Sequence, residues 1–388
     1  MKALPDRRSI RRILILKWSA LGDVALASAI MEDIRRAYPQ ARIDLDTLPT
    51  AAGLFAHDPR FERVLAIDSR ARRQRLRVVG TWLRSVRAGR YDLLIDLQGS
   101  DHTRGLVALA WLTGCGIRHR WSVRPGWPCT LAPRGLPRTA PAVDRMRALL
   151  ACADLAAATA LPVLHPAPVE IAQAQRMLRD HGLLSARFAV LLPGSQAAGW
   201  LKRWGVARYV QLAGLLLARG LERIAVIGGP DERDECAAIV AAINHHHPDA
   251  AIGLTTLSLL QIVPISAAAA LIVANDTGTA HIAAAAGTPL LVICGPTDPQ
   301  RVKPLGPQVR AVQADFGCLN CYGKRCRLGT TAQCFEPITP ARIASLLLDP
   351  SPDLQGLKLY GSSRPEAAVA PAHGRGCADS GSATAFSG

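Results

Sequence analysis

The stretch that decides the fold is Leu271-Ile-Val-Ala-Asn-Asp-Thr-Gly-Thr-Ala-His281, where an apolar run leads into polar residues and then an alanine-rich segment. The apolar run predicts a buried strand, and the residues after it predict a helix that ends near Gly287 and Pro289. A helix that starts directly after a strand presents unpaired N–H groups and the positive end of its dipole. Such a place binds anions, although an ordinary capped helix has the same pattern.

The side chains of this stretch suit an anion site. Asn275 or Asp276 can cap the helix, and Thr277 offers a hydroxyl. Gly278 lets a phosphate approach the backbone closely. His281 lies four residues after Thr277, so both are expected on one helical face.

Short apolar runs alternate with helical patterns in both halves of the chain. The run at 12–17 leads through Ser19-Ala-Leu-Gly-Asp23 into a helical pattern that ends at Tyr38. The same order of strand, glycine-containing loop and helix recurs after residue 187. This alternation predicts an α/β chain with parallel sheets and helices on both faces. Open sheets of this kind bind ligands at the carboxyl ends of their strands.

A proline-rich segment at 161–168 separates the two halves. At 388 residues the chain is too long for one compact core of ordinary size. We therefore expect two Rossmann-like domains, at 10–165 and 170–348, that face each other across a central cleft. Residues 351–388 are rich in Ser, Gly, Pro and Ala without periodicity, which predicts a disordered tail.

Basic residues are concentrated in the first half. The formal net charge is +16. Residues 1–150 hold 27 Lys and Arg against 13 Asp and Glu, a net of +14, which leaves +2 for residues 151–388. An acidic partner would dock on the first domain. Nucleic acid, a phosphorylated lipid, an anionic membrane surface and a merely solvated face all fit this charge.

No apolar run reaches the length of a transmembrane helix, and the run at 13–16 is too short for the core of a signal peptide. We expect a cytoplasmic protein. Most of the 10 cysteines are scattered singly, as Cys152, Cys236 and Cys294 are, and are expected to be reduced core residues.

The first loop supplies a carboxylate. Gly22 permits a tight turn, and Asp23 stands where the first helix begins. Asp23 is either an N-cap or a general base that takes a proton from an attacking hydroxyl.

The loop after the apolar run at 188–192 supplies a hydroxyl at Ser195 and a cation at Lys202. With the opening helix, these groups could hold phosphates from two sides; the alternative is a solvent-exposed Lys202. No Gly-x-Gly-x-x-Gly occurs in either loop, and no Walker A sequence occurs in the chain, so dinucleotide and P-loop chemistry lose their main support.

Five motifs follow one another along about residues 12–348. They are Ser19-Ala-Leu-Gly-Asp23, Tyr91-Asp-Leu-Leu-Ile-Asp-Leu-Gln-Gly99, Pro193-Gly-Ser195 with Lys202-Arg-Trp204, Asn275-Asp-Thr-Gly-Thr-Ala-His281 and Gly295-Pro-Thr-Asp-Pro299. In this order and approximate spacing, they resemble glycosyltransferase family 9, the family of ADP-heptose:lipopolysaccharide heptosyltransferases. Five ordered motifs are far more specific than any one of them.

The resemblance implies a GT-B fold and an inverting transfer that needs no metal or other cofactor. A heptose would move from ADP-heptose to an inner-core lipopolysaccharide acceptor, with Asp23 as the catalytic base. The donor would be bound by Ser195, Lys202, Asp276, Thr277, Gly278 and His281. Lys202 and the helix N-terminus would stabilise charge on the leaving diphosphate. Asp44-Leu-Asp46 is the only short Asp-x-Asp, and it alternates within a predicted strand, which indicates a structural role.

The basic first domain would then bind the acceptor. Inner-core lipopolysaccharide carries phosphates and acidic sugars and is assembled at the cytoplasmic face of the inner membrane, so peripheral membrane contact is expected. Candidate acceptor contacts are Ser19, Gly22, Arg118 and Arg120, with a solvated face as the alternative for each arginine. No nucleic-acid partner is expected.

Four cysteines remain, spaced Cys318-x2-Cys321-x4-Cys326-x7-Cys334. They are a candidate structural cluster for a metal, but their second half lacks the Cys-x-x-Cys of a zinc ribbon; reduced thiols or a disulfide are alternatives.

Three alternatives to the heptosyltransferase stay open. One is another sugar donor or acceptor within the same family, and another is a catalytically silent GT-B scaffold. The third is a basic nucleic-acid-binding protein with a cysteine metal site, which the aromatic content of 5% disfavours.

Overall fold

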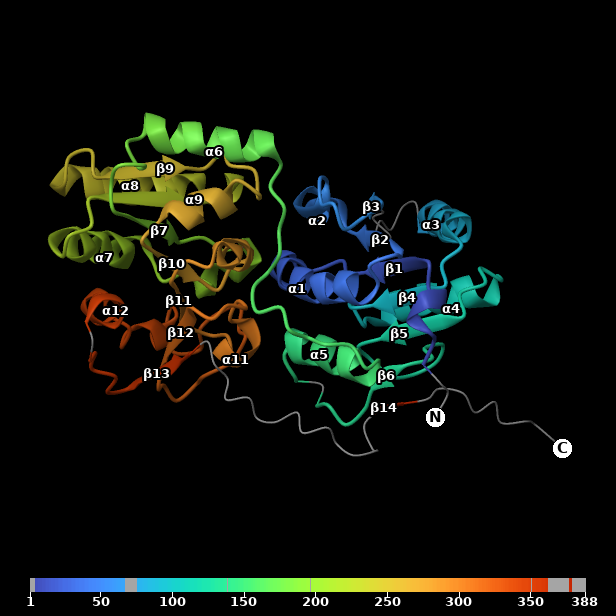
Figure 1. Ribbon diagram of the computed structural model, residues 1–388. Coiled ribbons are helices and arrows are strands. Elements are labelled where there is room, and N and C mark those ends of the chain that lie inside the picture. The colour runs from blue at the N-terminus through green and yellow to red at the C-terminus, as the bar shows by residue number, and fades with distance from the viewer. Residues whose placement is uncertain are drawn as a thin grey trace. The chain divides into compact units, whose positions relative to one another are not determined.

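The computed structural model describes residues 4–66, 75–137, 139–195, 197–349, 351–361 and 377–378. The chain forms two compact units, one built mainly from residues 1–159 and the other from residues 160–365 (Figure 1). The boundary lies at the start of the proline-rich segment predicted as the linker.

A five-stranded parallel sheet forms the centre of the N-terminal unit, in the order β3-β2-β1-β4-β5. This order around β1 is that of a Rossmann-like domain. The strands are β1 (Arg12–Leu16), β2 (Arg42–Thr47), β3 (Arg63–Ala66), β4 (Leu93–Asp96) and β5 (His119–Ser122). The helices are α1 (Leu21–Ala37), α2 (Pro49–Ala52), α3 (Arg75–Gly89), α4 (Asp101–Leu112) and α5 (Ala142–Cys152), with short 3-10 turns at Arg7–Ser9 and Gly53–Phe55.

Helices cover both faces of this sheet, as the alternating pattern predicts. On one side α1 packs against α5, and α3 packs against α4 on the other (Figure 1). The α3–α4 side has its own apolar core, in which Leu14 and Leu16 of β1 meet Trp82 of α3 and Leu106 of α4.

The C-terminal unit contains a seven-stranded sheet in the order β13-β12-β11-β10-β7-β8-β9. All neighbours are parallel except β12 and β13. The strands are β7 (Phe188–Leu192), β8 (Arg223–Ile227), β9 (Ala251–Leu254), β10 (Leu271–Asn275), β11 (Leu290–Cys294), β12 (Val309–Ala314) and β13 (Leu357–Tyr360). The helices are α6 (Pro168–Asp180), α7 (Val206–Ala218), α8 (Arg233–His246), α9 (Ile262–Ala268), α10 (Gly278–Ala283), α11 (Pro299–Val302) and α12 (Pro340–Leu348), with 3-10 turns at Ala197–Lys202, Pro230–Glu232, Ala284–Ala286 and Gln333–Phe335.

The predicted tail begins too early. Residues Leu357–Tyr360 form β13, which pairs with β12 and buries Leu357, so the second domain extends beyond residue 348. The strand was missed because its four residues, Leu-Lys-Leu-Tyr, are too few to show a clear period. Cys377–Ala378 pairs with β6 (Ala132–Pro133). Residues 362–376 and 379–388 of the predicted tail lie outside the described residues.

The sequence makes predictions about two features, membrane-spanning helices and the singly placed cysteines Cys152, Cys236 and Cys294. Within the described residues, no helix is both long and apolar enough to cross a bilayer. Cys236 and Cys294 are free and buried, as predicted. Cys152 is disulfide-bonded, so the prediction of a reduced thiol is wrong for this residue, because a lone cysteine in a helical pattern carries no signal of its partner.

The two aspartates of β2 are held by side chains of the N-terminal unit. Asp44 accepts hydrogen bonds from Arg63 at 2.6 Å and from the Tyr91 hydroxyl at 2.5 Å. Asp46 is fully buried and accepts a hydrogen bond from the Trp82 indole at 2.6 Å. Burial raises the pKa of Asp46 to about 7, and the indole N–H groups of Trp82 and Trp18 offset part of that rise. These contacts support a structural role for both carboxylates.

We expect the buried Asp46 to make stability fall between pH 5 and pH 8. Its pKa is raised in the folded state, so its contribution is present at low pH and is lost as the pH rises through about 7. Asp46→Asn keeps an acceptor for Trp82 but cannot ionise, and should remove on the order of 2 kcal/mol of that pH dependence. Urea unfolding of both proteins at the two pH values measures the difference, with Asp154→Asn at an exposed carboxylate as the control. Identical pH dependence in native protein and Asp46→Asn would contradict this assignment.

Candidate functional site

Asp23 lies in the first turn of α1, at the carboxyl end of β1. The N-cap of this helix is Ala20, whose side chain makes no capping hydrogen bond. Asp23 is therefore not the cap, which was the alternative to a catalytic role. Its side chain is partly exposed, and Gly22 beside it is buried. Ser19, Gly22 and Asp23 thus lie together after β1, as predicted.

The loop before α1 is held by Gln98, a residue of the second motif. The side-chain oxygen of Gln98 accepts hydrogen bonds from the backbone N–H groups of Trp18 at 3.1 Å and Ser19 at 3.2 Å. The Trp18 ring packs edge-on against His102, with ring centroids 5.3 Å apart. The loop that carries Ser19 is therefore fixed by the loop between β4 and α4.

Asp96 in turn organises that second loop. Its buried carboxylate accepts hydrogen bonds from the backbone of Gln98 at 3.0 Å and Gly99 at 2.9 Å, and from the Thr103 hydroxyl at 3.0 Å. Burial raises the pKa of Asp96, and these donors offset part of the rise. The role of the motif at 91–99 is thus to shape the edge of the sheet next to Asp23.

Lys17 is a charged residue of this site that the sequence analysis did not select. It is buried directly after β1, and its Nζ lies 3.4 Å from the Ser19 carbonyl oxygen. Burial lowers the pKa of Lys17, and the nearby charge of Asp23 raises it in part. A lysine at the end of an apolar strand, two residues before the motif that holds Asp23, was the available signal. Lys17 places a cation beside the candidate base.

In the C-terminal unit, Asn275 joins the segments that carry the candidate donor residues. Its side-chain oxygen accepts hydrogen bonds from the Trp204 backbone at 3.3 Å and from the Tyr209 hydroxyl at 3.0 Å. Its amide nitrogen donates to the carbonyl of Pro193. Asn275 is fully buried, so all these bonds are shielded from water. The Asn275 amide is thus a connector and does not cap α10.

Lys202 and Asp276 form an ion pair at the carboxyl ends of β7 and β10. Lys202 Nζ lies 2.8 Å from Asp276 Oδ2, with 34% of the lysine side chain exposed against 9% of the aspartate. At the end of the neighbouring strand β11, burial raises the pKa of Cys294, the nearby charge of Asp276 adds to the rise, and that of Lys202 opposes it. The more exposed lysine is the member of the pair that can receive an anionic ligand.

Ser195 is buried in the turn that leads to Lys202. Its hydroxyl donates to the Gly199 carbonyl at 2.8 Å, and its own carbonyl accepts from Arg203 at 2.8 Å. Arg203 also pairs with Glu235 at 2.7 Å. Through these contacts, Ser195 holds the conformation of the loop between β7 and Lys202.

Gly194 lies against the end of the Glu232 side chain. A Cβ at this position would lie 1.9 Å from the carboxyl group of Glu232, so a larger residue would force that side chain to move.

Thr277 is the N-cap of α10, in place of the predicted Asn275 or Asp276. Asn275 still belongs to β10, and Asp276 pairs with Lys202. The Thr277 hydroxyl accepts a hydrogen bond from Thr279 at 3.3 Å. Gly278 begins the helix and is partly exposed, whereas His281 is 7% exposed.

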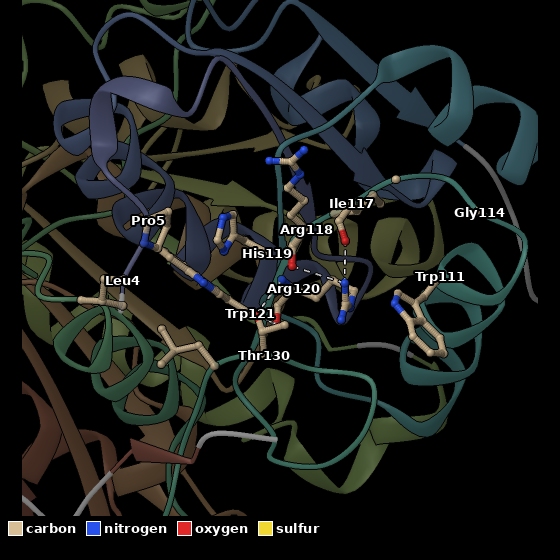
Figure 2. A pocket seen from close by; sticks show the side chains of 12 residues that line it. Leu4, Pro5, Trp111, Gly114, Ile117, Arg118, His119, Arg120, Trp121 and Thr130 are labelled. Carbon is tan, nitrogen blue, oxygen red and sulfur yellow. Dashed lines mark hydrogen bonds between the residues drawn. The ribbon is translucent and has the colours of Figure 1, made fainter. Parts of the chain in front are cut away.

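Arg118 and Arg120 are not brought to this edge of the N-terminal sheet. In the register of β4 with β5, Ser122 is opposite Asp96 at the carboxyl end, whereas Arg120 is opposite Leu94 and Arg118 precedes the strand. Figure 2 shows both arginines in a separate pocket of 560 Å³. There the Arg120 guanidinium donates to the carbonyls of Ile117 and Pro128. Arg120 thus holds its own loop, at the end of β5 away from Asp23.

The four closely spaced cysteines of the C-terminal unit, Cys318, Cys321, Cys326 and Cys334, are free. Cys334 is buried, which raises its pKa to about 11 together with the nearby charges of Cys318 and Cys321. Hydrogen bonds from backbone N–H groups lower the pKa of Cys326, and the bond from Gln333 has the largest effect. Among the residues that the structure describes, no three His, Cys, Asp or Glu side chains are arranged to hold a metal ion.

Comparison with known proteins gives consistent matches along the chain. The sequence model of glycosyltransferase family 9 (heptosyltransferase) matches residues 79–332. The chain is 28% identical over 375 residues to lipopolysaccharide heptosyltransferase 1 of Pseudomonas aeruginosa, covering 87% of this chain and 97% of that protein. It is 27% identical over 358 residues to lipopolysaccharide heptosyltransferase 2 of Salmonella typhimurium, with coverages of 86% and 96%.

Solved structures show the same fold. A glycosyl transferase family 9 protein from Veillonella parvula superposes with a TM-score of 0.74 at 20% identity, covering 87% of this chain and 97% of that chain. E. coli ADP-heptose lipopolysaccharide heptosyltransferase II gives a TM-score of 0.65 at 24% identity, with coverages of 87% and 98%. With two Rossmann-like units, these likenesses confirm the predicted GT-B fold.

Removing the Asn275 amide should loosen the C-terminal unit. Asn275→Ala leaves buried partners on Trp204, Tyr209 and Pro193 without a hydrogen bond, and should lower the free energy of unfolding by about 2–4 kcal/mol. Thr277→Ala, two residues away and partly exposed, is the matched control and should cost less than about 1 kcal/mol. Urea unfolding measures both. Equal stability of the two variants would refute the connecting role of Asn275.

Proposed function

Because the chain belongs to glycosyltransferase family 9, we propose that this glycosyltransferase moves a heptose from ADP-heptose to an inner-core lipopolysaccharide acceptor. The likeness to lipopolysaccharide heptosyltransferases over most of both chains supports the proposal. The observation that carries it is the Lys202–Asp276 pair, which puts an accessible cation at the strand ends where such sheets bind ligands.

Lys202 would bind the donor diphosphate. In the free protein its charge is balanced by Asp276, and an arriving diphosphate would compete with that carboxylate for the ammonium group. Thr277 and the backbone at Gly278 would contact the donor next to it. Ser195, which holds the turn that leads to Lys202, and the more buried His281 would also lie against the donor.

Asp23 would be the general base of an inverting transfer. Its carboxylate would accept the proton of the acceptor hydroxyl as that oxygen attacks the anomeric carbon of the sugar. The bond from that carbon to the diphosphate would break with its electron pair, and ADP would leave with the added negative charge. Lys202 would stabilise this charge, so the reaction would need no metal ion. Ser19 and Gly22 would contact the acceptor beside Asp23.

We place the reaction in the cytoplasm, at the inner face of the inner membrane, because the acceptor is anchored there. The net charge of residues 1–150 fits an anionic acceptor. Within the same family, a different nucleotide sugar or acceptor is the second candidate, since the described residues around Lys202 do not specify a sugar.

Replacing the base should slow the chemical step and leave donor binding intact. With ADP-heptose and heptose-deficient lipopolysaccharide, Asp23→Asn should lower kcat about 10²–10⁴-fold in an ADP-release assay. Asp180→Asn, at an exposed carboxylate of α6, is the control and should keep the native rate. Native turnover in Asp23→Asn would rule out the base, and no turnover of native protein with this donor would favour another nucleotide sugar.

Replacing Lys202 should make the enzyme less efficient with its donor in the same ADP-release assay. Lys202→Gln should lower kcat/KM for ADP-heptose about 10²-fold, because the leaving diphosphate loses its counter-charge. Excess EDTA should leave the native rate unchanged. A rate that collapses with EDTA and returns with a divalent ion would contradict the metal-independent mechanism.

A further inference from the structure

An apolar groove opens between α3 and α4 in the N-terminal unit. It has a volume of 450 Å³, and its lining includes Leu76 and Val79 of α3 and Leu109 and Leu112 of α4. Leu76 is 90% exposed and Leu112 is 65% exposed, the highest values among large hydrophobic side chains of the described residues. An exposed apolar groove of this kind marks an interaction site more often than a chance surface.

Two tryptophans lie near the end of α4, outside the groove. Trp111 lines the pocket of Arg118 and Arg120, and its ring packs edge-on against Trp127 with centroids 5.7 Å apart. Both rings are about half exposed. Tryptophan is favoured where an apolar phase meets water, because the ring is largely apolar and its N–H can still bind a polar group.

The helix beside the groove is strongly basic. The sequence of α3, Arg-Leu-Arg-Val-Val-Gly-Thr-Trp-Leu-Arg-Ser-Val-Arg-Ala-Gly, contains four arginines and no carboxylate. Arg77, Arg84 and Arg87 are exposed, and their spacing of seven and three residues puts them on one side of the helix.

The partners of these arginines leave their charge uncompensated. Arg84 bonds only to its own helix, at Gly80 and Thr81, and Arg87 donates to the Thr113 carbonyl after α4. In the described part of the chain, none of the three is paired with a carboxylate.

One side chain of the groove packs against the loop of the candidate acceptor site. The groove lining includes Asp101 and His102 at the start of α4, and the His102 ring packs against Trp18 beside Ser19. Leu112 lines the groove at the end of α4. Figure 1 shows α3 and α4 as neighbouring helices, and the two helices are in contact.

We propose that this surface docks the protein on an anionic phospholipid bilayer. The α3–α4 face consists of Leu76, Leu112, Arg77, Arg84 and Arg87, and Trp111 and Trp127 flank it near the end of α4. The leucines enter the boundary between headgroups and acyl chains, the tryptophans lie at its edge, and the arginines neutralise acidic headgroups. The inference deepens the proposed function, because a membrane-anchored acceptor would then meet the unit that carries Ser19.

Charge favours a bilayer over other occupants. In a two-fold dimer built on this face, each copy would place uncompensated arginines near those of the other, and the repulsion would oppose association. Nucleic acid would satisfy the arginines but leave the exposed leucines without apolar contact. An acidic bilayer satisfies both sets of side chains at once.

Vesicle co-sedimentation tests the docking face directly. Native protein should bind vesicles of phosphatidylethanolamine with phosphatidylglycerol, bind phosphatidylcholine vesicles much less, and lose binding as salt is added. Arg77→Gln/Arg84→Gln should lower the partition coefficient about thirtyfold, and Leu76→Ser/Leu112→Ser at least about tenfold. Leu184→Ser/Leu328→Ser, at exposed leucines of the C-terminal unit, is the matched control and should bind as native protein does.

Three results would overturn the docking face. They are unchanged vesicle binding by both double variants, equal binding to phosphatidylcholine, and a change of oligomeric state in the leucine variant without a change in vesicle binding. ADP release with a delipidated, soluble acceptor should be native in both variants, which also shows that they fold. Native protein that binds vesicles but releases no ADP would contradict the proposed function and leave the docking face standing.

Discussion

The candidate donor side of this enzyme depends on one buried side-chain amide, that of Asn275. It stands at the end of β10 and bonds to Pro193 after β7, to the Trp204 backbone and to Tyr209 of α7. Lys202 lies two residues before Trp204, and Asp276 directly follows Asn275. The same amide that joins the segments therefore sets the distance at which the lysine and the aspartate pair. Because the amide is buried, water cannot replace its bonds, and the segments are held firmly.

The N-terminal unit uses a similar device with different residues. Gln98 accepts two backbone N–H groups from the loop before α1, and the buried Asp96 fixes the loop that carries Gln98. Asp23 follows this loop in the first turn of α1, with Lys17 buried beneath it. In both units a polar side chain at one strand end positions the loop at a neighbouring strand end. The motifs at 91–99 and 275–281 therefore contain residues that hold the loops of the candidate site.

The sequence predicted the parts of the fold that depend on long apolar runs. The strands at β1, β7, β8, β10 and β11 are apolar and buried, so their pattern was visible. The pattern did not reveal β5, whose His-Arg-Trp-Ser sequence is polar, nor the antiparallel β13. Both strands are defined by pairing with a neighbour, which single-sequence periodicity does not contain.

For the candidate site, the sequence predicted several of the residues but not which of them meet. Lys202 and Asp276 were selected separately as donor contacts, but their ion pair depends on two loops meeting, which only the fold brings about. Arg118 and Arg120 were selected as acceptor contacts by charge alone, whereas the register of β5 puts them away from its carboxyl end. The burial of Lys17 was not predicted, because a lysine directly after a strand is usually solvated. Residue type predicts the chemistry available, and the strand order decides which groups meet.

Equilibrium binding of ADP tests the central claim most directly, because it separates holding the diphosphate from the transfer itself. Titration calorimetry should show that Lys202→Gln weakens ADP binding at least about tenfold, whereas Asp23→Asn binds ADP as native protein does. Equal affinity of native protein and Lys202→Gln would contradict the assignment of the donor site.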